Sequence, residues 1–433
     1  MEPYAVGILG IIFVLIGLLL AIPIAAILAI VSFLGIWVLS GWDVGLNTLG
    51  LAALREAASW DFAAVALFIA IGAIATRSGM ANDLFDALSS WFGEIKAGLM
   101  VATTLAAAFF GACCGTTIAS CMLFGKLAAP RMIERGYNPS WAVGLIATSG
   151  TLAALIPPSA ILILYGILTQ QSIAHLFIGT LVPGVMTAAL YVLIIVVAAL
   201  VKPDIAPTFE KVSWKKKVSA LKRSWGLPLV GLFIITSLYT GIATPTEVAA
   251  IGACFTAIVA LLYKGWGRAD LWSSFVETAV DSAMVLLIVI AAKLFGRFLT
   301  MTELTPVAMN FVQKSGLPRE GVLLFIIFLY LVAGCVMDSL SMAVISIPVV
   351  YPIITGLGYD PVWFGVVLAQ LVEIGVITPP VGMNVFVTKS VVGDVVTLSQ
   401  VFRTSMVFLL GNVVVLVLVL VFPNLVLWLP SRM

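Results

Sequence analysis

The sequence predicts a polytopic α-helical membrane protein, and three observations support this fold class. Of the 433 residues, 62% are hydrophobic and only 10% are charged, whereas a soluble domain carries about 25% charged residues. Apolar stretches close to the roughly 20 residues that cross a bilayer recur along the whole chain. Within these stretches, runs such as residues 192–201 and 413–421 are continuously apolar and lack the alternation of barrel strands. Soluble, disordered and coiled-coil classes are excluded, and we expect about ten crossings with shorter elements between them.

The chain consists of two related halves. A shift of 222 residues without a gap superposes residues that are rare in an apolar sequence. The coincident residues are Cys113 with Cys335, Trp141 with Trp363, and Pro157–Pro158 with Pro379–Pro380. Chance matches between apolar segments would pair aliphatic residues instead. We therefore expect one repeat over residues 1–201, a second over residues 225–433, and a basic linker at residues 202–224.

The distribution of basic residues predicts how the two halves are oriented. The linker is rich in Lys and Arg, and short basic loops stay in the cytoplasm. Counting spans from the linker places the basic loop Arg131–Arg135 in the cytoplasm. Its counterpart, residues 355–360, has no Lys or Arg and falls on the outside. Equivalent loops on opposite sides indicate an inverted-topology repeat, which is typical of secondary transporters.

Each half contains one predicted hairpin. The first, at about residues 97–130, is interrupted by residues 111–117, and both of its ends are expected on the cytoplasmic side. The second, at about residues 321–353, would open on the other side. Such irregular backbone is tolerated in a membrane only where it is buried in protein or lines an aqueous cavity. An ordinary kinked span is the alternative for each hairpin.

A broken helix follows each hairpin, at about residues 140–170 and about residues 361–390. Two adjacent prolines remove backbone donors and clash with the preceding turn, so we expect the helix to unwind around Pro157–Pro158 and Pro379–Pro380. Unwinding frees carbonyl groups for a cation and turns helix N-termini toward an anion. If two hairpin tips and two helix breaks meet at one place, the arrangement indicates an ion-coupled anion transporter.

Polar residues at these irregular points are the candidate ligands. Hydroxyl and amide oxygens suit a hard cation such as sodium. The candidates are Thr116, Thr117, Ser149, Thr151, Ser339, Ser341, Thr378 and Asn384. A hydrogen bond from each hydroxyl to the carbonyl of the preceding helical turn is the structural alternative.

Asp338 and Glu373 are stronger candidates, because carboxylates inside a membrane are costly and usually functional. A protonated or paired structural carboxyl group is the alternative for each. No catalytic arrangement stands out: His175 is the only histidine, and no metalloprotease motif, phosphate-binding glycine loop or nucleophile elbow occurs. We therefore expect no enzymatic activity and no cofactor apart from a coupling ion.

Several strings resemble a known family. They are Gly241-Ile-Ala-Thr-Pro-Thr-Glu247, Ile156-Pro-Pro-Ser159 and Ile374-Gly-Val-Ile-Thr-Pro-Pro-Val-Gly382. They resemble the large membrane subunit of tripartite ATP-independent periplasmic (TRAP) transporters, and the likeness extends over essentially the whole chain. The resemblance implies an elevator-type transport domain and sodium-driven uptake of organic acids across the bacterial inner membrane. It also implies two partners, a small membrane subunit and a periplasmic substrate-binding protein.

The family's ion and substrate sites lie at the hairpin tips and helix breaks. Carried onto this sequence, they are Gly115, Thr116, Thr117, Ser149, Gly150, Thr151, Asp338, Ser339, Gly375, Thr378, Pro379 and Pro380. The first tip departs from the family pattern, which is rich in Gly and Ser with an acid soon after. Here the tip reads Cys-Cys-Gly-Thr-Thr at residues 113–117, and no acid follows before Glu134. The first ion site, or the substrate, is therefore expected to differ.

Residues 44–59 and 267–278 carry charges among aromatic residues, and we expect interfacial helices that contact the small subunit. Short loops are the alternative there. For the whole chain, a stand-alone ion-coupled dicarboxylate or anion carrier of related architecture is the second hypothesis. A membrane-embedded enzyme or assembly factor is a third, which the scarcity of His and clustered acids disfavours. The sequence leaves open which substrate is carried and whether sodium or protons drive it.

Overall fold

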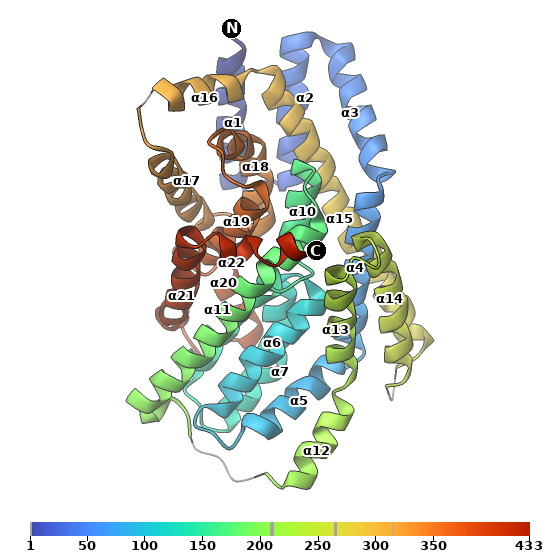
Figure 1. The fold of residues 1–433 in the computed structure, drawn as a ribbon, viewed down its shortest axis with the longest axis vertical. Coiled ribbons are helices and arrows are strands. Elements are labelled where there is room, and N and C mark those ends of the chain that lie inside the picture. The colour runs from blue at the N-terminus through green and yellow to red at the C-terminus, as the bar shows by residue number, and fades with distance from the viewer. Residues whose placement is uncertain (1, 208–211, 264–265, 315) are drawn as a thin grey trace.

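The computed structural model describes residues 2–207, 212–263, 266–314 and 316–433, and the secondary structure of these residues is entirely helical. Figure 1 shows the path of the chain. The helices of the first half are α1 (Pro3–Leu19), α2 (Ile24–Ser40), α3 (Trp42–Ala57), α4 (Trp60–Arg77), α5 (Met80–Phe92), α6 (Gly98–Cys114), α7 (Thr117–Glu134), α8 (Pro139–Ser149), α9 (Leu152–Leu155), α10 (Ala160–Thr169) and α11 (Ile173–Val201). The rest are η1 (Pro203–Ile205), α12 (Trp214–Arg223), α13 (Gly226–Tyr239), α14 (Pro245–Leu261), α15 (Arg268–Met301), α16 (Leu304–Lys314), α17 (Arg319–Gly334), α18 (Ser339–Gly356), α19 (Pro361–Gly375), α20 (Met383–Val392), α21 (Leu398–Val421), α22 (Asn424–Leu427) and η2 (Pro430–Arg432).

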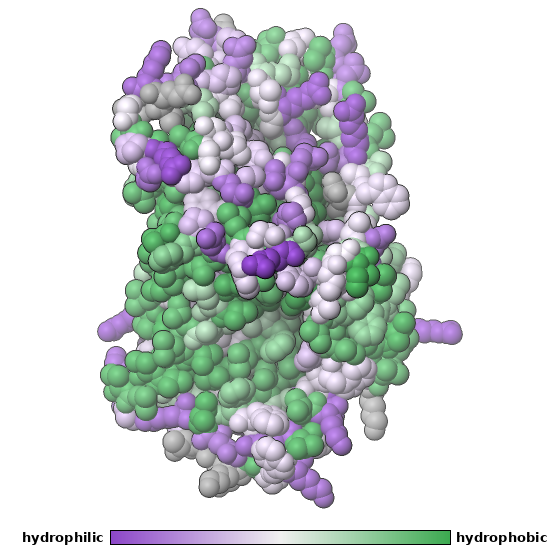
Figure 2. Space-filling model, viewed as in Figure 1, coloured by the Kyte–Doolittle hydropathy of each residue, from purple (hydrophilic) through white to green (hydrophobic). Residues whose placement is uncertain are grey.

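The fold is that of a multi-pass membrane protein. Within the described residues, five helical segments are long and apolar enough to cross a bilayer, or up to seven if each of two bent helix pairs is one span. Several further apolar helices are shorter than a full span, so fewer complete crossings are found than the ten expected. Figure 2 shows the apolar side chains as a broad band between polar ends. Such a band matches the hydrocarbon core of a lipid bilayer.

The helices of the two halves follow each other at the spacing of 222 residues. Helices α7 and α18 begin and end at equivalent positions. Helices α8 and α19 both begin at a proline that follows a capping Asn138 or Asp360. Helices α1, α2 and α10 begin one residue away from the positions equivalent to the starts of α13, α14 and α20. The shared sequence pattern is therefore matched by shared local structure.

The halves differ at the position of α3 and α4. These two helices are bent by 54° relative to each other, whereas the equivalent part of the second half is the single 34-residue helix α15. Residues 268–278 are helical, as expected, but they form the start of α15 rather than a helix of their own, and their contact with a small subunit stays a prediction. A continuous helix forms there because residues 268–301 contain neither Gly nor Pro before Gly296.

The linker is also more structured than a simple connection. Of residues 202–224, residues 208–211 lie outside the described part of the chain. The remainder contains the short η1 turn and the ten-residue helix α12. Helix α12 lies beside α5 at the lower end of the molecule in Figure 1. Lysine and arginine favour helix, so a basic stretch that finds a packing partner becomes helical.

The broken helices occupy the centre of the molecule. In the segment Pro139–Thr169, 89% of the most hydrophobic 18-residue window is buried, against 22% for the outer helix α15. Every residue of α19 from Trp363 to Gly375 is buried as well. The break at Pro157–Pro158 is buried too, which is a condition under which unwound backbone is tolerated in a membrane, whereas Pro379 and Pro380 at the second break are exposed.

Each hairpin packs against a broken helix through small residues. A Cβ atom added at Gly375 would lie 2.5 Å from the Cα atom of Gly334, near the end of the first arm of the second hairpin. In the first half, a Cβ atom at Gly111 would lie 2.6 Å from the Cα atom of Ala153, the residue equivalent to Gly375. Small residues of this kind allow helices in membranes to approach closely.

Replacing Gly375 by Ala should therefore lower the melting temperature of the purified chain. The added methyl group meets backbone rather than a flexible side chain, so overpacking should cost about 1–3 kcal/mol. Gly50→Ala is the matched control, because Gly50 lies within α3 and a Cβ atom there meets nothing within 4 Å. Thermal unfolding of both variants in the same detergent tests this packing. Equal melting temperatures for the two variants would contradict it.

Candidate functional site

A cavity of about 540 Å³ lies between the tips of both hairpins and two outer helices. The α6–α7 tip contributes Cys114 to Ala119 and the α17–α18 tip contributes Asp338 to Leu340. Val376, Met383 and Asn384 come from the second broken helix, and Ala154, Ala160 and Ile161 come from the first. Helices α4 and α15 form the opposite wall. The predicted hairpin tips and breaks therefore meet around one space.

Backbone hydrogen bonds join each hairpin tip to the neighbouring helix break. The carbonyl oxygen of Gly115 accepts from the amide of Ala160 at 3.1 Å, and that of Cys335 accepts from the amide of Val381 at 3.1 Å. In both cases the donor lies one or two residues after the second proline of the pair. Gly115 is required at its position, because φ is +68° and a Cβ atom would lie 2.7 Å from the carbonyl oxygen of Pro158.

Six of the predicted site residues line the cavity. They are Gly115, Thr116, Thr117, Asp338, Ser339 and Asn384. The other predicted residues do not line the cavity. They are Ser149, Gly150, Thr151, Ser341, Glu373, Gly375 and Thr378, together with the prolines Pro157, Pro158, Pro379 and Pro380. The hairpin tips therefore form the inner surface of the cavity, and most of the break residues support them.

The supporting hydroxyl groups of the breaks are hydrogen bonded within the protein. Thr378 donates to the carbonyl oxygen of Ile374 at 2.6 Å, and Thr151 donates to that of Thr148 at 2.7 Å. Ser149 lies 3.3 Å from the hydroxyl oxygen of Thr104. For Thr378 and Thr151 the structural alternative raised by the sequence is the arrangement found, so these two hydroxyl groups are occupied by local bonds.

Asp338 combines exposure to the cavity with a structural role. Its carboxylate accepts hydrogen bonds from the amides of Leu340 and Ser341 at 3.1 and 3.2 Å, which makes it the N-cap of α18. The hydroxyl of Ser341 also donates to this carboxylate. A carboxylate held at a helix N-terminus is stabilised by the exposed amides, which allows a charge at this position.

Glu373 and Asn384 are buried polar residues with unused hydrogen-bonding capacity. Ser339 donates to Oε1 of Glu373 at 3.4 Å, while Oε2 of Glu373 has no hydrogen-bond partner among the described residues. Neither side-chain polar atom of Asn384 has a partner there either, although the residue is fully buried. Unpaired buried polar groups are costly unless something satisfies them. Their chemistry fits a hard cation or a polar substrate group beside the second tip.

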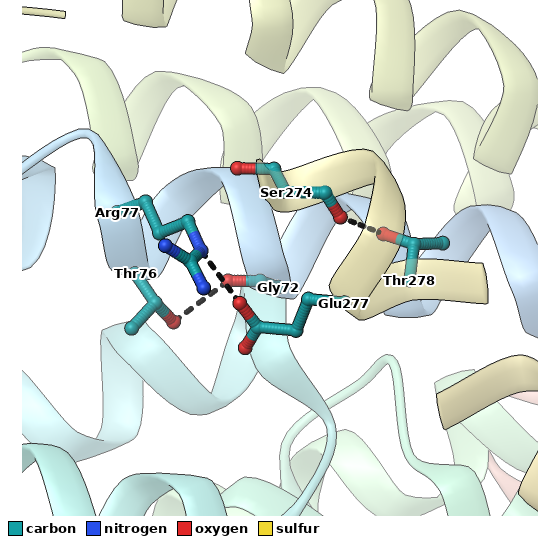
Figure 3. Close-up of polar contacts among 6 residues, drawn as sticks. All are labelled: Gly72, Thr76, Arg77, Ser274, Glu277 and Thr278. Carbon is teal, nitrogen blue, oxygen red and sulfur yellow. Dashed lines mark hydrogen bonds and ion pairs between the residues drawn. The ribbon is translucent and has the colours of Figure 1, made fainter. Parts of the chain in front are cut away.

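Two acidic residues of the cavity, Glu277 and Asp281, were missed from the sequence. They lie one helical turn apart on α15, and Met284, Val285 and Ile288 continue the same stripe. Glu277 forms an ion pair with Arg77 of α4 at 2.6 Å, and Figure 3 shows the two side chains pointing toward each other across the two helices. The signal was present as carboxylates spaced i, i+4 at the start of an apolar run. It was overlooked because Glu277 was assigned to an interfacial helix.

The acids of the cavity have no basic counterpart on its surface. Its described lining residues include the carboxyl groups of Glu277, Asp281 and Asp338, and no Lys or Arg. These carboxyl groups lie on two sides of the cavity, on α15 and at the second hairpin tip.

Comparison with known proteins gives the family. The tripartite ATP-independent periplasmic transporter, DctM component, matches residues 9–425. The chain belongs to this DctM family. It is 32% identical over 388 residues to the C4-dicarboxylate TRAP transporter large permease protein of Pseudomonas aeruginosa, covering 89% of this chain and 90% of that protein. It is 32% identical over 376 residues to the ectoine TRAP transporter large permease protein of Halomonas elongata, covering 85% and 86%.

The fold also has a solved counterpart. The crystal structure of the YdaH transporter of Alcanivorax borkumensis aligns with a TM-score of 0.60 over 98% of this chain and 99% of that chain, at 14% sequence identity. The family and the apolar helices make the chain a multi-pass membrane permease, and its relatives are transporters rather than enzymes. Large permeases of this family work with a small membrane subunit and a periplasmic binding protein.

The capping role of Asp338 allows its charge to be tested separately from its contribution to folding. Asp338→Asn retains an N-cap side chain and should leave the melting temperature unchanged, whereas Asp338→Ala should lose about 1 kcal/mol of stability. If the carboxylate binds the coupling cation, Asp338→Asn should raise the sodium concentration for half-maximal uptake roughly tenfold, the expected loss for a contact to a charged group. Uptake into proteoliposomes at varied sodium concentration measures this. A titration equal to that of the unaltered chain would remove Asp338 from the ion site.

Proposed function

We propose that this chain is the large transmembrane subunit of a sodium-coupled transporter that imports an organic acid across the bacterial inner membrane. A periplasmic binding protein delivers the substrate, and a small membrane subunit completes the transporter. The observation that carries the proposal is the cavity in which both hairpin tips and both broken helices face α4 and α15. A midplane site made of discontinuous helices is the usual arrangement in secondary transporters.

The two walls of the cavity support an elevator-type movement. One wall consists of irregular backbone at tips and breaks, tied together by the hydrogen bonds of Gly115 and Cys335. The other wall consists of regular stripes of residues on α4 and α15. On α4 the stripe is formed by Val65, Ile69, Gly72 or Ala73, and Thr76, which recur at helical spacing. A unit that carries the substrate can slide along such a regular wall without breaking its own internal bonds.

The inverted relation of the two halves completes this mechanism. Figure 1 places the α6–α7 pair in the lower half of the molecule, on the side of the basic helix α12, and the α17–α18 pair in the upper half. Basic segments favour the cytoplasmic side, so the first hairpin would open to the cytoplasm and the second to the periplasm. Two equivalent hairpins facing opposite sides give each side of the membrane one hairpin as its gate.

Sodium coupling is supported by the chemistry of the cavity. Oxygen ligands are available from Thr116, Thr117, Ser339 and Asn384, together with the carboxylate of Asp338. No basic side chain among the described lining residues offers a charge partner for an organic acid. Bound sodium ions would provide the positive charge, so substrate and ions would bind together and move together.

The substrate is not fixed by membership of the family. Relatives of equal similarity, both 32% identical, are named for a C4-dicarboxylate and for ectoine. The second hypothesis, a stand-alone ion-coupled carrier, differs from the proposal only in its independence from a binding protein.

Reconstitution separates these possibilities. The chain is placed in proteoliposomes with its small subunit, and uptake of a labelled C4-dicarboxylate and of labelled ectoine is followed with and without the binding protein. An inward sodium gradient should drive uptake only when the binding protein is present, and replacing sodium by potassium should abolish it. Sodium-driven uptake without the binding protein would favour the stand-alone carrier, and uptake driven by a proton gradient alone would contradict sodium coupling.

A further inference from the structure

A second cavity lies away from the transport site, at the end of the molecule that carries the linker. It has a volume of about 390 Å³ and is formed by α5, the start of α6, the end of α7 and α12. Among its described lining residues, four are cationic and one is a carboxylate: Arg131, Arg135, Lys216 and Arg223, and Asp86. The described lining therefore carries more positive than negative charge.

The neighbouring acids that are described do not pair with all of these cationic side chains. Asp86 forms an ion pair with Arg131, whose guanidinium group also lies 5.3 Å from the centre of the Phe85 ring. Asp83 lies on α5 near Arg223 but outside the lining of the cavity. Glu94 is engaged by Lys217 at 2.9 Å. Lys216 and Arg223 therefore contribute positive charge that the lining carboxylate does not cancel.

Helix α12 and the residues before it are fixed in place by contacts with α5 and the loop that follows α5. Besides the Lys217–Glu94 ion pair, the amide of Val212 donates to Glu94 at 3.0 Å, and the indole nitrogen of Trp91 donates to the carbonyl oxygen of Lys217 at 3.2 Å. These bonds hold α12 against the loop after α5. The cationic side chains of α12 are thus positioned before any ligand arrives, which lowers the entropic cost of binding.

Exposed apolar residues on the other face of α12 place this helix at the membrane surface. The rings of Trp91 and Trp214 lie 5.5 Å apart, and Trp214 and Leu221 are 67% and 53% exposed. Tryptophan is enriched where the bilayer meets water, and basic amphipathic helices lie in this same layer. Helix α12, and with it the cavity that it lines, therefore lies at the level of the lipid headgroups.

We propose that this cavity binds the phosphate headgroup of an anionic phospholipid from the cytoplasmic leaflet, such as phosphatidylglycerol. Arginine and lysine recognise phosphate by charge-assisted hydrogen bonds, and the hydroxyl groups of Ser90 and Ser219 line the same space. Basic pockets between helices on the cytoplasmic side bind such headgroups in other membrane proteins.

Helix α12 itself provides a matched pair of variants to test the site. Lys216→Gln with Arg223→Gln removes two charges that line the cavity. Lys215→Gln with Lys222→Gln removes two charges from the same helix that do not line it. Melting of the purified full chain is followed during titration with short-chain phosphatidylglycerol, short-chain phosphatidylcholine or inorganic phosphate.

Phosphatidylglycerol should raise the melting temperature of the unaltered chain by at least about 3 °C, and phosphatidylcholine and inorganic phosphate should not. In the cavity variant the half-saturating concentration of phosphatidylglycerol should increase about 30-fold, whereas the control variant should respond like the unaltered chain. Equal losses in both variants would show a diffuse charge effect and overturn the site. A response to inorganic phosphate equal to that of phosphatidylglycerol would assign the cavity to free phosphate instead. No response to any of the three would overturn the proposal, and none of these outcomes depends on sodium-coupled transport.

Discussion

Unwound backbone inside a membrane must find hydrogen-bond partners within the protein, and this requirement organises the centre of the molecule. The carbonyl groups at the two hairpin tips accept from amides that follow the two proline pairs, through the bonds of Gly115 with Ala160 and of Cys335 with Val381. Each tip therefore satisfies its neighbouring break. The close contacts of Gly334 with Gly375 and of Gly111 with Ala153 bring these partners within reach.

Much of this arrangement could be predicted because polar and irregular residues are conspicuous in an apolar chain. The hairpins, the broken helices and the tip residues Thr116 and Asp338 were all visible as interruptions of hydrophobic runs. Glu277 and Asp281 were not recognised, because a charged residue at the edge of an apolar run has the same appearance whether it faces water or a cavity. The contact between Gly334 and Gly375 has no sequence signal at all, since glycine occurs at 37 positions for many reasons.

The strings that carry the family resemblance have structural explanations of their own. In the string at residues 241–247, Thr244 is an N-cap, Pro245 occupies the first turn of α14, and Glu247 bonds back to the amide of Thr244. These residues form a capping box, which specifies where a helix begins. In the string at residues 374–382, Gly382 has a φ of +54° and ends the second break. These two strings of the family pattern therefore contain residues that determine where helices begin and end.

The two proline pairs occupy equivalent positions but different surroundings. Pro157 and Pro158 are buried, whereas Pro379 and Pro380 are exposed. The same local structure is thus compatible with two environments in a single molecule. For a transporter whose halves are related by inversion, exchanging these environments would produce a second conformation of nearly equal energy that opens to the opposite side. The structure would then represent one of two states related by a pseudo-two-fold axis in the membrane plane, and reversed burial of the two proline pairs would identify the other state.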